Sequence, residues 1–158
     1  EFQSMGQVNR TGGDRRQQSQ QDISALVASR SETLSLYAEL ATHRPFQQNE
    51  NFKEELMHFC EALIDYTANA HFQLYQHMAE NKERRQPVVK VADHIYPKIA
   101  ETTDRILAFN DRYGELSELA NKIEKVEQDL SSIGEILADR IQYEDQVIEA
   151  MRGERRRL

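Results

Sequence analysis

The chain has 158 residues, of which 30% are charged, and it carries a formal net charge of −7 with a single cysteine. One cysteine excludes an internal disulfide, and no apolar run approaches the roughly 20 residues that a membrane-spanning helix needs. Six glycines and three prolines are few for this length, which favours an all-α protein with one domain. The N-terminus lacks the apolar segment of a secretory signal, so we expect a cytoplasmic protein.

Residues 1–18 are rich in Gln, Gly and Arg, which predicts a disordered or marginally helical segment before a single bundle domain over 19–152. A first helix is expected over 19–41. Its stripe contains Ile23, Leu26, Val27, Arg30, Leu34, Tyr37, Ala38 and Ala41. A second helix begins after Asn49 or Asn51, either of which can cap it, and runs to about Ala79. It can bend near residues 68–70.

A polar link over 80–86 leads to a third helix, which Pro87 opens. Pro97 has no N–H to donate and must kink this helix or start another, and the pattern then continues to Tyr113, before Gly114. The last and longest helix has apolar residues alternately three and four apart: Leu116, Leu119, Ile123, Val126, Leu130, Ile133 and Leu137. Past Leu137 the register shifts by one, to Ile141, Ile148 and Met151. This heptad seam predicts an antiparallel helical bundle in which the seam is buried against the second helix.

Charge is unevenly distributed along the chain. Residues 152–158 hold four Arg and one Glu, which leaves 16 basic and 26 acidic residues elsewhere, a net charge of −10. An acidic body repels nucleic acid and attracts basic protein surfaces. The basic tail over 153–158 is either a solvated end or a phosphate-contacting arm. Because the basic clusters lack interleaved aromatics and a helix-turn-helix pattern, we expect no direct binding of nucleic acid.

The second predicted helix has two faces with large apolar side chains. At about 100° per residue, one face forms a stripe that suits the core. It contains Leu56, Phe59, Cys60, Leu63, Thr67, Ala70 and Leu74. Phe72 lies roughly opposite Leu63 and almost in line with Asp65. The same face also contains Glu61, Ala68, Asn69 and Gln76. An apolar anchor beside a charge is what a partner-binding face needs, and a further helix covering Phe72 explains the pattern equally well.

Catalytic and metal-binding patterns are sparse. Glu55 and His58 form one Glu-x-x-His pair, whereas a di-iron bundle site needs two such pairs and further carboxylates. A Gly-rich phosphate loop, a Cys-x-x-Cys motif and a nucleophile elbow are absent from the sequence. Glu144 and Asp145 are most simply the polar side of the last helix. We therefore expect no enzymatic activity, no cofactor and no metal. A helical metal-binding bundle or enzyme is the alternative function.

Several short motifs are informative together. The second helix contains Phe59-Cys60, Ile64-Asp65-Tyr66, Ala70-His71-Phe72 and Tyr75. Later segments contain Ile95-Tyr96-Pro97 with Ile99, the run Leu130 to Glu135, Ala138-Asp139-Arg140 and Glu144-Asp145. Over residues 20–151, in this order and with near-matching spacing, the chain resembles the Rsd/AlgQ family of bacterial regulators of sigma D.

The resemblance implies an all-helical, non-enzymatic protein whose partner is the primary sigma factor of RNA polymerase. It implies binding to the sigma factor's C-terminal promoter-recognition region, which sequesters it from core polymerase. It also implies that Asp65 and Phe72, which the helical wheel already separates from the core stripe, lie in that interface, and Arg30 matches a basic position of the family. The predicted partner-binding residues are therefore Asp65, Phe72, Ala68, Asn69, Glu61 and Arg30.

Overall fold

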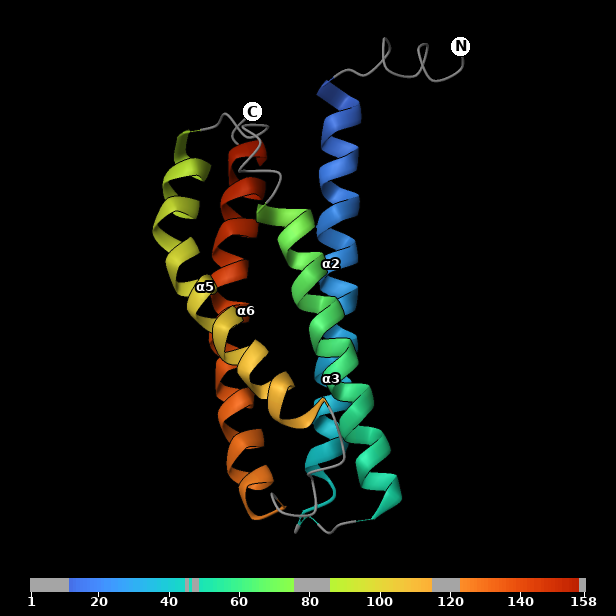
Figure 1. Cartoon of the computed structure of the whole chain (residues 1–158). Helices are drawn as coiled ribbons and strands as arrows, with labels where there is room; N and C mark the ends of the chain where they lie inside the picture. The colour runs from blue at the N-terminus through green and yellow to red at the C-terminus, as the bar shows by residue number, and fades with distance from the viewer. Residues whose placement is uncertain (1–11, 45, 47–48, 76–85, 115–122, 157–158) are drawn as a thin grey trace.

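The chain is helical through almost all of the part that the structure describes. The structure is a computed structural model that describes residues 12–44, 46, 49–75, 86–114 and 123–156. Its elements are α2 (Gly12–Ala41), α3 (Glu50–Ala70), the π-helix η1 (His71–Tyr75), α5 (Gln86–Tyr113) and α6 (Ile123–Arg156). Figure 1 shows α2 and α5 running down and α3 and α6 running up. The predicted all-α antiparallel bundle with a long last helix is confirmed.

Helix α2 ends at Ala41 as predicted but begins at Gly12, before the predicted start at Ser19. Gln17, Gln20 and Gln21 are exposed, and no apolar periodicity in the sequence marks the segment before Ser19. The predicted stripe is also wrong at Leu34, which is 38% exposed, and at Ala38, which is exposed as well. Thr33 takes the core position instead, because its hydroxyl can donate to the carbonyl oxygens of Ser29 and Ala62 (3.0 and 3.3 Å).

Helix α3 is capped by Asn49, the first of the two predicted capping residues. The side-chain oxygen of Asn49 accepts the N–H of Phe52 at 2.8 Å, which satisfies one of the free donors of the first turn. At its other end the helix widens directly after Ala70 into η1, next to the predicted bend. A π-turn accommodates an extra residue and changes the direction of the side chains around it. Residues 76–79 of the predicted helix lie outside the described residues.

Helix α5 is one continuous element with Pro97 inside it. It changes direction about halfway along (Figure 1), as expected where a proline removes a donor and crowds the carbonyl four residues earlier. The side chains of Thr102 and Thr103 then donate to the carbonyl oxygen of Ile99 (2.6 and 3.2 Å). The helix ends at Tyr113, before Gly114, as predicted.

The helices pack in two pairs, α2 with α3 and α5 with α6. Helix α6 therefore lies mainly beside α5, and the prediction that its seam packs mainly against the second helix is wrong. The second helix still reaches the seam through Tyr66, which contacts Arg140 and Glu144. The core stripe of α3 is confirmed, since all seven of its predicted residues are buried. In α6, Val126, Leu130, Ile133 and Leu137 are buried as predicted. Leu116, Leu119 and the side chain of Ile123 lie outside the described residues. None of the described helices is long and apolar enough to cross a membrane.

Candidate partner-binding groove and the polar network behind it

The second predicted face, which runs along α3 and into η1, is open to solvent. Phe72 is 63% exposed, and Asp65, Ala68 and Glu61 are exposed as well, while Asn69 is half-buried. The ring of His71 lies edge-on against Phe72, with centroids 5.5 Å apart. The sequence left open whether a further helix covers Phe72. The exposure of this ring shows that the described helices do not bury it.

A cavity of about 540 Å³ lies beside Phe72, between α3 and α5. Its walls are mostly apolar, with Ala68 and Phe72 on one side and Leu107 on the other. Leu107 is itself 45% exposed, although sequence analysis did not select it. Leu107 stands three residues after Asp104, which lines the same cavity. Two exposed large apolar side chains thus border one hollow.

A second, more polar depression of about 470 Å³ adjoins the first, because Ile64 lines both. It contains Asp65 and Glu61 from α3 and Asn110 from α5. We call the two hollows together the α3–α5 groove. Its lining carboxylates are Glu61, Asp65 and Asp104, all exposed. The groove therefore combines an apolar cavity with an acidic rim.

Cys60 lies beneath the second depression and is only 2% exposed. Burial raises the pKa of its thiol to about 12. The interpretation of Cys60 as a buried apolar residue is confirmed, since a thiol of this kind is neutral near pH 7.

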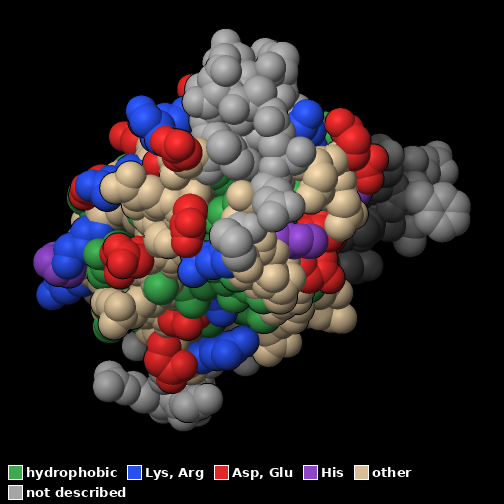
Figure 2. Space-filling view, turned by 90° about the horizontal axis from the view of Figure 1, so that it is seen from below, with side chains coloured by type: hydrophobic (Ala, Val, Ile, Leu, Met, Phe, Trp, Pro, Cys, Tyr) green, Lys and Arg blue, Asp and Glu red, His purple; other side chains and the backbone are tan. Residues whose placement is uncertain are grey.

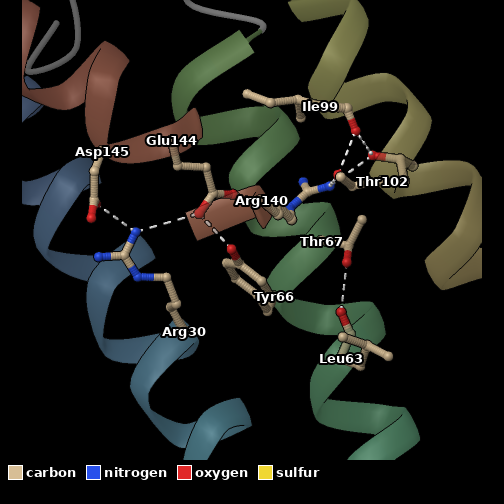
Figure 3. A network of polar contacts seen from close by, with 10 residues as sticks. Arg30, Leu63, Tyr66, Thr67, Ile99, Thr102, Arg140, Glu144 and Asp145 are labelled. Carbon is tan, nitrogen blue, oxygen red and sulfur yellow. Dashed lines mark hydrogen bonds and ion pairs between the residues drawn. The ribbon is translucent and has the colours of Figure 1, made fainter. Parts of the chain in front are cut away.

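Arg30 does not join the other predicted site residues. Its guanidinium bonds Asp145 (2.9 Å) and Glu144 (3.4 Å) of α6, and its side chain is 13% exposed. Glu144 also accepts the hydroxyl hydrogen of Tyr66 from α3 and the Nε–H of Arg140 (3.0 Å). Figure 3 shows Arg30 on the far side of Tyr66 from the α5 residues. Arg30 is thus a member of an internal polar network.

The network crosses the whole bundle. Arg140 donates through Nη1 to the hydroxyl oxygens of Thr102 (3.1 Å) and Thr103 (2.8 Å), so that residues from α2, α3, α5 and α6 are connected. The guanidinium carbon of Arg140 also lies 5.5 Å from the ring centroid of Tyr66. Burial raises the pKa of Glu144 above its usual value, and the charge of Arg140 opposes that rise. The carboxylate and both of its closest partners are removed from water.

The assignment of Glu144 to the polar side of the last helix is wrong, because its side chain is fully buried. Only the neighbouring Asp145 is exposed. The predicted register shift is also wrong at Ile141, which is half-buried. The seam instead continues at alternate spacings of three and four through Leu137, Arg140, Glu144, Val147 and Met151, all buried. Arg140 and Glu144 keep the heptad spacing unbroken, and this spacing was the signal in the sequence that both side chains are buried.

The residues first considered for a metal are separated. Glu55 pairs with His43 at the α2–α3 corner, while His58 is exposed. Among the described residues, no group of three or more His, Cys, Asp or Glu side chains is arranged to hold a metal ion. Protein purified without added metal is expected to contain far less than one equivalent of iron, manganese or zinc, because three or four converging ligands are needed. Elemental analysis by mass spectrometry tests this, and one equivalent per chain would favour the metal-binding alternative.

A helical bundle with an apolar groove and an acidic rim is suited to holding another protein. The family described as "Regulator of RNA polymerase sigma(70) subunit, Rsd/AlgQ" matches residues 5–152, and the chain belongs to this family. The resemblance found in the sequence is confirmed.

Relatives named "Regulator of sigma D" include a protein of Yersinia enterocolitica serotype O:8, 30% identical over 125 residues. That alignment covers 78% of this chain and 72% of the relative. A protein of Yersinia pseudotuberculosis serotype O:1b is 34% identical over 95 residues. That alignment covers 60% of this chain and 56% of the relative. A protein of Enterobacter sp. (strain 638) is 31% identical over 101 residues, and the alignment covers 61% of this chain and 58% of the relative. No solved structure matches the chain.

Proposed function

We propose that this chain binds the primary sigma factor of RNA polymerase at its C-terminal promoter-recognition region and keeps it from the core enzyme. The action is stoichiometric rather than catalytic, and we place it in the cytoplasm. The family and the names of its members support a sigma factor as the partner. The observation that carries the choice of surface is that Phe72 and Asp65 are both exposed on the same side of the bundle. These are the two positions that the family resemblance assigns to the interface.

Physical chemistry supports this surface. Large aromatic side chains in the centre of an interface provide much of the binding energy, and nearby charges set orientation and association rate. Phe72 supplies such an anchor, and Asp65 and Glu61 supply charge beside it. Arg30 is held by Glu144 and Asp145, so we assign it to support of the fold and not to direct contact.

The direct test is a competition experiment. The purified chain is mixed with the primary sigma factor, and increasing core polymerase is added while the complex is followed by fluorescence anisotropy. The proposal expects a one-to-one complex that core polymerase displaces. A sigma variant without its C-terminal region should not bind. A complex that forms equally well without that region would contradict the proposed contact, and no complex at all would contradict the function.

The association rate is expected to fall about tenfold as salt rises from roughly 0.05 to 0.5 M, because rim charges steer encounter and are screened over about 8–10 Å. Acidic and basic side chains are interspersed on the end of the bundle shown in Figure 2. We expect the steering to come from the carboxylates of the groove rim, Glu61, Asp65 and Asp104. Stopped-flow mixing measures this rate. Glu61→Gln with Asp65→Asn should flatten the salt dependence. A parent rate that is independent of salt would contradict the idea.

A further inference from the structure

We infer that the segment held in the α3–α5 groove is a basic amphipathic helix, gripped between Phe72 and Leu107. This rests on the proposed function and adds a second wall to the contact surface, formed by Leu107 and Asp104 of α5. Neither residue was selected from the sequence. The affinity of the partner segment should therefore depend on these two residues of α5.

Among the described residues, the exposed large hydrophobic side chains are Leu34, Phe72 and Leu107. Single exposed apolar residues are common on protein surfaces and need no explanation. Phe72 and Leu107, however, line one cavity of about 540 Å³ from opposite helices. A hollow with an apolar residue on each wall suits the apolar face of a helix, which inserts anchors at spacings of three and four.

The rim of the groove determines the charge of the occupant. Asp65 and Glu61 lie along α3, and Asp104 lies on α5, one helical turn before Leu107. The one arginine that lines the cavity, Arg140, is fully buried and bonded to Glu144, so its charge is already compensated. The occupant should therefore carry Lys or Arg beside its apolar stripe. The body of a second copy fits poorly, because outside residues 152–158 the chain has a net charge of −10.

The test compares two exposed leucines in the full-length chain. Leu107→Ala removes a groove wall, whereas Leu34→Ala removes a leucine of similar exposure from α2 that does not line the groove. Titration with the full-length primary sigma factor should give affinity reduced about tenfold or more for Leu107→Ala and within about twofold of the parent for Leu34→Ala. Both variants should melt within a few degrees of the parent, since both positions are solvent-exposed.

The charge is tested by a second pair. Asp104→Asn should slow association with the sigma factor several-fold at low salt, and Asp93→Asn, an exposed carboxylate of α5 outside the groove, should not. If the parent binds the sigma factor but Leu107→Ala and Asp104→Asn bind like it, this inference is wrong and the proposed function stands. If the parent fails to bind, the proposed function itself fails. A parent dimer in sedimentation that Leu107→Ala dissociates would assign the groove to a second copy and overturn the inference.

Discussion

Replacing Glu144 with alanine is expected to lower the free energy of unfolding by about 3–5 kcal/mol, the usual cost of removing one partner of a buried ion pair. The truncation leaves the guanidinium of Arg140 in the core with its charge uncompensated, although Thr102 and Thr103 still accept two hydrogen bonds. The hydroxyl of Tyr66 also loses its acceptor. Such a loss is a large part of the stability of a domain of this size.

The adjacent residue provides the control. Asp145 is the next carboxylate along α6 and bonds the same Arg30, but its side chain is 54% exposed. Asp145→Ala should therefore cost no more than about 1 kcal/mol. Urea denaturation followed by circular dichroism gives both values, and the slope of the transition shows whether the comparison is between similar unfolded states. Equal midpoints for the two variants would show that the buried network contributes little to the fold.

Phe72→Ala and Asp65→Ala are each expected to weaken sigma binding by about 2 kcal/mol, which is roughly thirtyfold in affinity. In the proposed interface, the first substitution removes an apolar anchor and the second removes a charge that faces Lys or Arg of the partner. Neither should change the unfolding free energy by more than about 0.5 kcal/mol, because both side chains are exposed. Binding titrations and thermal melts on the same preparations measure the two effects separately.

Leu63 distinguishes an interface effect from a folding effect. It lies on the opposite side of α3 and is fully buried, so Leu63→Ala should destabilise the bundle by about 2–5 kcal/mol. Sigma binding by the fraction that stays folded should be close to that of the parent. The proposed interface is wrong if Phe72→Ala binds like the parent, or if it unfolds the bundle as severely as Leu63→Ala.

Periodicity was enough to predict most of the helices and the core of α3. The stripe that contains Leu63 is buried because an α-helix separates its faces by a fixed angle. Phe72 is exposed as expected, although it lies in η1, just past the end of α3. Periodicity failed where a polar side chain found a partner in the core. Thr33 displaced Leu34, and Arg140 and Glu144 continued the seam, because each group satisfies its hydrogen bonds inside the bundle. Such partners lie on other helices, so no single helical pattern reveals them.

The candidate site was half predictable. One wall of the groove is a single helical face, and Glu61, Asp65, Ala68 and Phe72 were selected from it. The other wall belongs to α5, about 40 residues further along the chain. Leu107 and Asp104 become part of the site only when α5 packs beside α3, and the kinked course of α5 sets which residues face the groove. The position of α5 beside α3 depends on tertiary packing, which cannot be predicted from the periodicity of a single helix.

The buried thiol of Cys60 has a practical use. It is the only cysteine of the chain, and with a pKa of about 12 it forms almost no thiolate at neutral pH. A cysteine introduced at exposed Ala68 would therefore be the single site that a maleimide dye modifies. The dye would sit at the edge of the groove without any background mutation to remove a native thiol. Its emission would report, in real time and at one known place, when the groove becomes occupied.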